Sequence, residues 1–166
     1  MTDSSRSSRR SARAAASRPV PSIRPLRSSD FFAWIELYDQ YLRLMGGEFT
    51  DSRALRFWQS IERMQDVASF VAERSGHFAG FAVASPVLDA VAGELKLEVL
   101  AIYVEEFERD GAALEALFGE LHSHAASLGA TALTWRAPMG DSAYTRMSSR
   151  LGALTDLGTY EMPVYR

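Results

Sequence analysis

The chain has 166 residues, of which 47% are hydrophobic and 23% charged, with a formal net charge of −3 and no cysteine. This length is enough for one domain with a sizeable core, and the composition is that of a soluble globular protein. The lack of cysteine excludes disulfides, thiol nucleophiles and cysteine-bound metals. No apolar run approaches the ~20 residues that a membrane helix needs. These features fit a cytoplasmic protein.

Residues 1–21 differ in composition from the rest of the chain. They contain five arginines against one aspartate, a net charge of +4, whereas the remainder carries 13 basic and 20 acidic residues, a net charge of −7. This segment is made largely of Ser, Arg and Ala and shows no apolar periodicity, so we expect a disordered basic tail before a folded domain over 22–166. A transit peptide has a similar composition. The tail is the one part where we expect weak contact with nucleic acid or an acidic partner.

The first half of the domain predicts one strand followed by two helices. Residues 22–27 read as a short edge strand, where Pro25 is tolerated. Asp30 is expected to cap a helix that ends at Gly46, and Thr50 or Asp51 is expected to cap a second one. Each helix has an apolar face at helical spacing, made of Phe31, Trp34, Ile35, Tyr38, Leu42 and Met45 in the first and Leu55, Trp58, Ile61 and Met64 in the second. Most of these side chains should be core; as an alternative, some of Tyr38, Tyr41, Glu48 and Phe49 line a pocket.

The second half predicts alternating strands and helices. Residues 67–73 and 78–85 read as two antiparallel strands around a tight turn, and 86–93 as a loop. A strand over 95–104 is followed by a helix over 112–128, a strand over 130–136, a helix from Asp141 to Leu151 and strand residues within 153–165. The helix over 112–128 has one apolar stripe, formed by Leu114, Leu117, Phe118, Leu121, Ala125 and Leu128. The predicted fold class is therefore α/β, with a mixed sheet and the order β-α-α-β-β-β-α-β-α-β.

The step from strand 95–104 to helix 112–128 is the most informative part of the chain. Such a turn directs backbone N–H groups and the positive end of the helix at a neighbouring ligand, which is usually a phosphate. The turn holds Gly111 and Arg109, and also four acids, Glu105, Glu106, Glu108 and Asp110. The alternative is a purely structural helix whose acids stabilise its N-terminus.

Several local motifs, in this order and spacing, resemble the GNAT-type N-acetyltransferases over residues 22–166. They are Gly80-Phe81-Ala82, Ile102-Tyr103-Val104, the spacing from Val104 to Arg109, the Trp135 to Asp141 step, and Met147, Arg150 and Leu151. The step from Trp135 to Asp141 is similar to one in the polyamine-acetyltransferase-like branch of the family. The resemblance implies a GNAT-like fold and direct transfer of an acetyl group from acetyl-CoA to a primary amine of a small molecule. From the residues themselves we expect no metal, since there is no HExxH pattern and no third ligand beside the two helical histidines. His122 and His124, two apart on a helix, do not share a face.

The resemblance also implies roles for individual residues. The backbone of Ile102, Tyr103 and Val104 would bind the thioester and the CoA arm. The pyrophosphate would lie at the helix start, against Arg109, Asp110, Gly111, Ala112, Ala113 and Leu114, while Asp141 occupies a position where the family has Asn. A carboxylate such as Glu98 or Glu48 would deprotonate the acceptor ammonium, directly or through water. The alternatives are that Glu98 is a surface carboxylate at a strand edge and that Glu48 is a solvated loop residue. A homodimer, formed through terminal strands, is an expectation from the resemblance alone.

Two departures from the family pattern support a different reading. The loop reads Arg-Asp-Gly-Ala-Ala-Leu over 109–114 in place of R-G-x-G-x-G, and shifting the frame puts Glu108 at the Arg position. Ser148 replaces the tyrosine that the family uses as general acid, and Tyr144, one turn earlier on the same helix face, is a possible substitute. The alternative function is a catalytically degenerate GNAT-like binding or regulatory domain that no longer uses acetyl-CoA.

Overall fold

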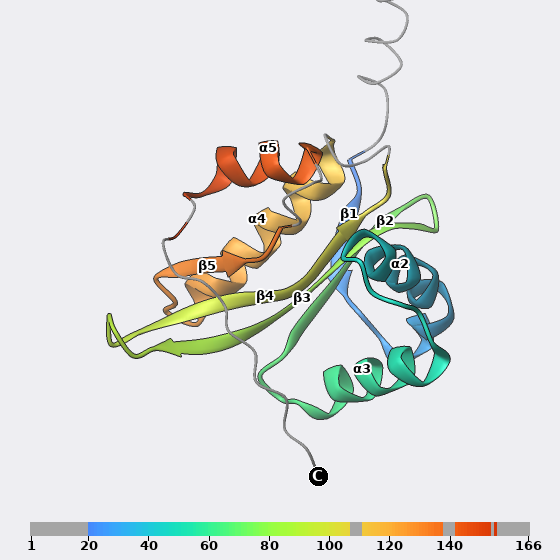
Figure 1. Cartoon of the computed structure of the whole chain (residues 1–166), viewed down its shortest axis with the longest axis horizontal. Helices are drawn as coiled ribbons and strands as arrows, with labels where there is room; N and C mark the ends of the chain where they lie inside the picture. The colour runs from blue at the N-terminus through green and yellow to red at the C-terminus, as the bar shows by residue number, and fades with distance from the viewer. Residues whose placement is uncertain (1–19, 107–110, 138–141, 154, 156–166) are drawn as a thin grey trace, which may run out of the picture. The chain divides into compact units, whose positions relative to one another are not determined.

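The computed structural model describes residues 20–106, 111–137, 142–153 and 155. The chain divides into two compact units, with the boundary between Arg136 and Ala137, and each is described by itself. The first contains β1 (Ser22–Pro25), the 3-10 turn η1 (Ser28–Asp30), α2 (Phe31–Leu44), α3 (Asp51–Arg63), β2 (Ala68–Arg74), β3 (His77–Asp89), β4 (Glu94–Val104), α4 (Ala112–Ser127) and β5 (Ala132–Trp135) (Figure 1). The second contains α5 (Ser142–Leu151). The predicted order is confirmed as far as α5; the last predicted strand lies outside the described residues.

The five strands of the first unit form one mixed sheet in the order β1-β2-β3-β4-β5. The first four are antiparallel to their neighbours, and β4 pairs with β5 in parallel. The parallel pair is possible because α4 carries the chain back over the sheet between the two strands. Pro25 lies in β1, whose one sheet neighbour is β2, so the predicted edge strand is confirmed.

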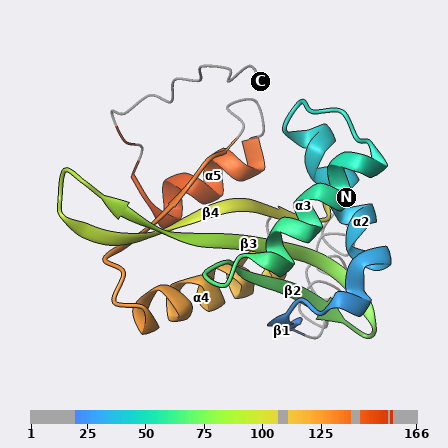
Figure 2. The same ribbon diagram turned by 90° about the horizontal axis from the view of Figure 1, so that it is seen from below.

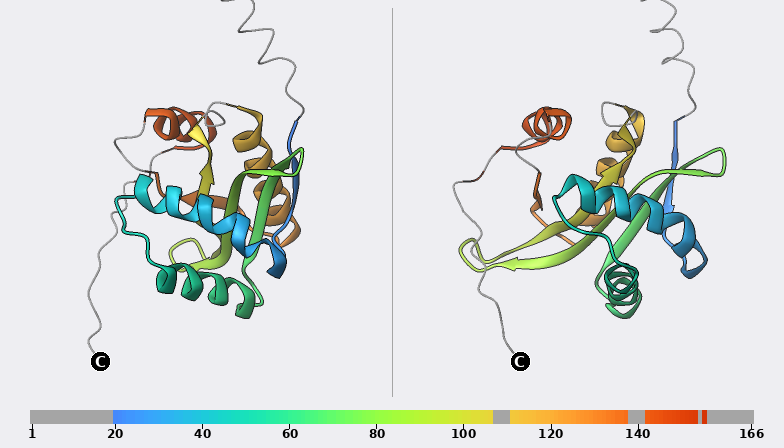
Figure 3. Two further views of the ribbon diagram at one scale, coloured as in Figure 1. Left: turned by 90° about the vertical axis from the view of Figure 1, so that its right-hand side faces the viewer. Right: turned by 45° about the vertical axis from the view of Figure 1, so that its right-hand side comes forward.

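The helices of the first unit cover both faces of this sheet (Figure 3). On one face, α2 and α3 pack through an aromatic core in which Trp34 is fully buried, stacks on Tyr38 at 4.7 Å and meets the edge of Phe81 from β3. On the other, α4 contacts all five strands and buries Ala113, Leu114, Leu117, Phe118, Leu121 and Ala125. Because neighbouring strand residues point to opposite faces, each strand supplies side chains to both cores.

Four residues predicted on apolar helix faces are exposed instead. They are Met45, Leu55, Met64 and Leu128, each at least 39% exposed. Met45, Met64 and Leu128 directly follow the last residue of their helices, where the chain turns away from the sheet. A periodic pattern identifies the face of a helix but not the point at which that face leaves the core.

The loop predicted over 86–93 is wrong. Strand β3 continues to Asp89 and β4 begins at Glu94, with Pro86 opposite Leu97. Figure 2 shows this hairpin extending past the end of β2. The pairing of β2 with β3 reaches only Ala84, so at Pro86 the side of β3 that faced β2 has no partner strand. Proline has no N–H, and at this position the sheet therefore loses no hydrogen bond.

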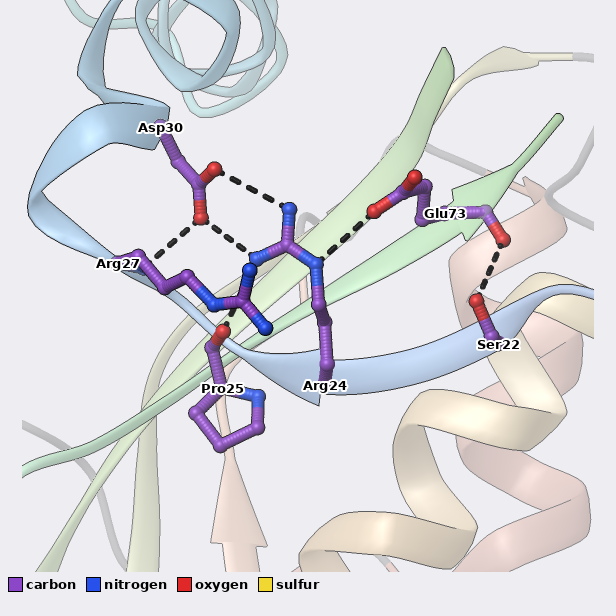
Figure 4. A network of polar contacts seen from close by, with 6 residues as sticks. All are labelled: Ser22, Arg24, Pro25, Arg27, Asp30 and Glu73. Carbon is purple, nitrogen blue, oxygen red and sulfur yellow. Dashed lines mark hydrogen bonds and ion pairs between the residues drawn. The ribbon is translucent and has the colours of Figure 1, made fainter. Parts of the chain in front are cut away.

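Asp30 is the N-cap residue of α2, as predicted, but its side chain makes no hydrogen bond to the first turn of that helix. Its carboxylate accepts two hydrogen bonds from Arg24, Nη1 at 2.7 Å and Nη2 at 3.1 Å, and one from the backbone N–H of Arg27 at 2.8 Å (Figure 4). Arg24 Nε also donates to Glu73 at 2.9 Å. The carboxylate therefore ties β1 and β2 to the start of α2. Thr50 caps α3 as predicted, its hydroxyl accepting from the N–H of Arg53.

No helix within the described part of the chain combines the length and apolar character needed to cross a membrane.

Candidate active site at the end of strand β4

Strands β4 and β5 pair over only part of the length of β4. The parallel ladder joins Lys96–Val99 to Ala132–Trp135, whereas β4 continues to Val104 (Figure 1). Directly after Val99 the register with β3 shifts, because Val99 pairs with Ala84 and Ala101 with Val83. Leu100 is thus the extra residue of a β-bulge, and bulges bend a strand and often lie beside active sites. The two strands therefore part at the point where β4 bends.

The hydrogen-bond pattern beyond the bulge decides which backbone groups face the β5 side. Glu105 N–H donates to the carbonyl of Ala79 at 3.0 Å, which makes this a hydrogen-bonded pair. In an antiparallel ladder such pairs alternate with pairs whose backbone groups point away from each other. Tyr103 is therefore bonded toward β3, and Ile102 and Val104 point their backbone groups to the β5 side. All three residues are buried, but the backbone role predicted for them fits Ile102 and Val104 only.

A close contact between β3 and β4 holds the end of β4 in place. Gly80 lies opposite Val104, and a Cβ atom on Gly80 would lie 2.6 Å from both the Tyr103 carbonyl oxygen and Val104 Cγ1. Glycine is thus required for the observed separation of the strands. The Tyr103 hydroxyl donates to Gln40 Oε1 on α2 at 2.8 Å, which fixes the same strand end from the helix side.

The acids predicted to crowd the phosphate turn are not all directed at it. Glu105 binds His77 Nε2 at 3.0 Å, so its carboxylate points back along β3. Glu106 is exposed. Glu108, Arg109 and Asp110 lie outside the described residues, and the roles predicted for Arg109 and Asp110 remain predictions.

Helix α4 begins where the sequence predicts. Gly111 is its N-cap and has no side chain to cap the first turn, which is formed by Ala112, Ala113 and Leu114. The first two residues of the helix are alanines, and the third, Leu114, has its side chain buried. No large side chain therefore covers the backbone N–H groups of this turn. Because first-turn N–H groups have no partner within their helix, this helix start fits a diphosphate such as that of acetyl-CoA.

The predicted base Glu98 lies in a cluster with Tyr41 and Arg136. Glu98 pairs with Ser85, on the sheet face that α2 covers, and its Oε1 is 3.3 Å from Arg136 Nη2. Tyr41, on α2, donates its hydroxyl to the carbonyl of Leu100 in the bulge at 3.4 Å. The Glu98 side chain is 30% exposed and that of Arg136 is 69% exposed, so both charges are open to solvent. We call these three residues the Tyr41–Glu98–Arg136 cluster.

The two tyrosines of α2 are held as phenols. Burial is the main cause that raises the pKa of Tyr41, and it also raises that of Tyr38. The charge of Arg136 acts in the opposite sense on Tyr41, as that of Arg53 does on Tyr38. Tyr41 therefore remains a hydrogen-bond donor at neutral pH, and its ring is stacked on Tyr38 with the ring centroids 6.0 Å apart.

The remaining predicted site residues are Glu48, in the first unit, and Ser148, Tyr144 and Asp141, in the second. Glu48 has an exposed side chain, and its carbonyl accepts a bond from Arg53. Ser148 lies in α5, half-buried, and its carbonyl accepts from Gly152 N–H at 2.9 Å. Tyr144 is also in α5, but its side chain lies outside what the structure describes, as does Asp141. Among the described residues, no group of three or more His, Asp or Glu side chains could hold a metal.

Sequence reasoning missed two features of this site. Thr134 in β5 pairs with Glu98. Residues two apart in a strand point to the same face, so Arg136, directly after β5, could have been placed on the face of Glu98. The bulge at Leu100 has no signal in a single sequence, because it depends on the register between β3 and β4.

Comparisons with known proteins bear on the fold. No protein-family model matches the chain, and no curated protein matches it. Solved structures do. A ribosomal-protein-alanine N-acetyltransferase from Brucella melitensis biovar Abortus 2308 has a TM-score of 0.69 at 18% identity, covering 86% of this chain and 98% of its own. Its sheet and helices match those described above. The chain has the GNAT acetyltransferase fold.

Two further GNAT-fold structures show the range of proteins that this chain resembles. The aminoglycoside acetyltransferase AAC(6')-Iy, solved with a bisubstrate analogue containing CoA, has a TM-score of 0.68 at 21% identity over 87% of this chain and 96% of its own. A protein from Bacillus halodurans C-125, described as a transcriptional regulator, has a TM-score of 0.71 at 15% identity over 87% of this chain and 99% of its own. The predicted GNAT resemblance is confirmed for the fold.

Proposed function

We propose that the protein is an acetyl-CoA-dependent N-acetyltransferase that transfers an acetyl group to a primary amine of a small molecule. The observation that carries this proposal is the parting of β4 and β5 at the Leu100 bulge. It leaves the backbone of Ile102 and Val104 facing the β5 side, next along the chain to the uncapped start of α4. The GNAT fold, and a CoA-containing ligand in one structure of that fold, support the same conclusion.

The described residues have distinct roles in this proposal. Ile102 and Val104 bind the CoA arm through backbone groups, and the first turn of α4 binds the diphosphate. Acetyl-CoA, when bound, supplies an acetyl group activated as a thioester. Glu98 takes a proton from the acceptor ammonium, since it lies two residues before the bulge residue Leu100 and its side chain is partly exposed. Tyr144 remains our candidate for the acid that protonates the leaving sulfur, with Ser148 in the position of the family's tyrosine.

Two measurements on the full chain test the proposal. Calorimetry measures acetyl-CoA affinity, and a thiol-reactive dye measures CoA released in the presence of amines. The dye reports CoA alone, because the protein contains no cysteine. We expect binding in the micromolar range and amine-dependent release of thiol. Acetyl-CoA binding with no release for any amine would contradict the proposal.

Matched substitutions then identify the base. Glu98→Gln should lower kcat about 100-fold with acetyl-CoA affinity unchanged, a loss typical of removing a general base. Glu48→Gln, the other predicted base, should leave kcat within about twofold, because its side chain is exposed and is not in the cluster. The reverse pattern would assign the base to Glu48.

A second candidate is a GNAT-like binding or regulatory domain that does not use acetyl-CoA. The acids Glu108 and Asp110 in the sequence, and the likeness to a protein described as a transcriptional regulator, favour it. Absence of acetyl-CoA binding at millimolar concentration would support this candidate over the enzyme.

A further inference from the structure

The Tyr41–Glu98–Arg136 cluster presents charges of both signs at one place. Glu98 Oε1 and Arg136 Nη2 are 3.3 Å apart, and both side chains are partly exposed. An ion pair open to solvent contributes little to stability, so an incoming ligand can readily separate it. The fold does not require this pair in the way that it requires the pairing of Arg24 with the 8%-exposed Asp30.

Two arginines act electrostatically on the tyrosines beside this pair. Arg136 acts on the ionisation of Tyr41, and Arg53 acts on that of the neighbouring Tyr38. Glu98 is the acidic member of the Tyr41–Glu98–Arg136 cluster and lies close to the bulge residue Leu100 in sequence. An acceptor with several amines would meet Arg136 as soon as one amine reached Glu98. Two like charges at such close range repel each other, and more strongly in a protein-like dielectric than in water.

We propose that the acceptor is zwitterionic: a small α-amino acid, or a molecule with the same adjacent ammonium and carboxylate, whose ammonium binds Glu98 and whose carboxylate binds Arg136. This inference rests on the proposed acetyl transfer. It names the class of acceptor and sets it apart from polycationic amines.

The geometry fits such a molecule. An α-amino acid carries its two charges on one carbon, so they are as close together as the charges of the protein pair that they replace. The guanidinium of Arg136 can bind a carboxylate through two parallel hydrogen bonds, which also orients the acceptor. The Tyr41 ring, held by Tyr38 and by the hydrogen bond to Leu100, forms a rigid wall beside the acceptor.

The reaction balances with these residues. The acceptor nitrogen forms a bond to the acetyl carbon, and the carbon–sulfur bond breaks, the sulfur leaving with the bonding electrons. The ammonium loses two protons in all. One passes through Glu98 to solvent and the other is retained by the CoA thiol. The product is an N-acetyl amino acid, which has lost its positive charge and so its attraction to Glu98.

The experiment compares matched acceptors on the full chain. Leucine and phenylalanine are set against isopentylamine and 2-phenylethylamine, which differ from them by loss of the carboxylate, and against spermidine as a polycation. Released CoA is measured with the thiol-reactive dye. We expect kcat/KM for the amino acids to exceed that for the matched amines about tenfold, the value of one charge-assisted interaction.

Variants of Arg136 separate recognition from a structural role. Arg136→Gln should raise KM about tenfold for the amino acids and leave KM for the matched amines within about twofold. Arg136→Lys, which retains the charge, should restore part of the loss. Arg43→Gln is the matched control, because Arg43 is also an exposed arginine paired with a carboxylate, that of Asp39 at 2.8 Å. It should not change the preference.

The outcomes distinguish this inference from the function on which it rests. Transfer to plain amines or spermidine in preference to amino acids, unaltered by Arg136→Gln, overturns the inference and leaves the acetyltransferase in place. If no acceptor releases CoA, calorimetry with leucine and phenylalanine decides. Millimolar or tighter binding that Arg136→Gln abolishes supports a zwitterion site without transfer, and no binding overturns the inference.

Discussion

The carboxylate of Asp30 is held in its ionised form by Arg24 and by the backbone of Arg27. The hydrogen bonds from Arg24 are the main cause that lowers the pKa of Asp30, and the N–H of Arg27 acts in the same sense against the opposing effect of burial. A folded-state pKa below the unfolded value of about 3.9 means that the ionised carboxylate stabilises the fold. This contribution is fully present above that unfolded value and is lost as the pH falls through the folded pKa.

Asp30→Asn should therefore destabilise the protein by about 2 kcal/mol at pH 7, since it removes charge-assisted hydrogen bonds from a buried group. The difference from the parent protein should shrink as the pH falls below about 4. Urea unfolding over a series of pH values measures both effects. Asp39→Asn is the control, because the Asp39–Arg43 pair on one helix is exposed at its arginine and should contribute about 0.5 kcal/mol or less. A difference for Asp30→Asn that persists unchanged to pH 3 would show that its cause is not ionisation.

Gly80 links the packing of the sheet to the site. Gly80→Ala would place a methyl group 2.6 Å from the Tyr103 carbonyl oxygen and from Val104, so β4 must move. We expect a loss of about 1–3 kcal/mol in stability and weaker acetyl-CoA binding, measured by urea unfolding and calorimetry. Gly119→Ala in α4 is the control, since its Cβ meets nothing within 4 Å. It should stabilise the protein by about 0.5–1 kcal/mol and leave binding unchanged.

The sequence predicted the position of a single site residue better than it predicted the partners of that residue. Glu98 was predicted as a base, and the structure places it beside the bulge. Its partners Tyr41 and Arg136 come from segments far away in the chain. Tyr103 was predicted to bind through its backbone, but the ladder with β3 directs its backbone groups elsewhere.

At the scale of elements, the bulge in β4 is the feature on which the proposed function most depends. Leu100 is the extra residue between the pairs Ala84–Val99 and Val83–Ala101, and it shifts the register of β4 against β3. Deleting Leu100 would bring these pairs into one continuous register, so we expect a folded protein with the far-UV spectrum of the parent.

Acetyl-CoA binding by the deletion variant should fall at least tenfold, because β4 no longer bends away from β5. Calorimetry measures this loss, and circular dichroism checks that the sheet is intact. Leu100→Ala, which retains the bulge and truncates an exposed side chain, is the control and should bind as the parent does. Full affinity in a folded deletion variant would show that the bulge is not needed to hold CoA.

Most elements could be predicted because their signals are local. Helical spacing of apolar residues identified α2, α3 and α4. Gly129, with φ of +72°, lies just after the end of α4, where glycine favours such a turn. The hairpin extension of β3 was missed because Pro86 and Gly93 resemble a loop. That Pro86 can occupy a strand there depends on β2 ending its pairing at Ala84, a fact of tertiary structure.

At the scale of the whole molecule, charge is divided between the N-terminal segment and the rest of the chain. Removing residues 1–19 changes the formal net charge from −3 to −7, since they carry five arginines and one aspartate. We expect the thermal midpoint to stay within about 2 °C, because the segment has no apolar pattern with which to join a core. Acetyl-CoA affinity should stay within twofold at 0.15 M salt, where charges interact over about 8 Å. A larger loss of affinity would show that this segment takes part in binding.

The sequence by itself determined the class and order of the elements, the α4 start at Gly111 and the candidate Glu98, because each depends on residues close together in the chain. Only the tertiary structure decided where β4 parts from β5, which backbone groups of β4 face that opening, and that Arg136 and Tyr41 meet Glu98. These features depend on strand register and on packing between distant segments. A shift of one residue in register moves every side chain to the other face, and a single sequence carries no local signal for it.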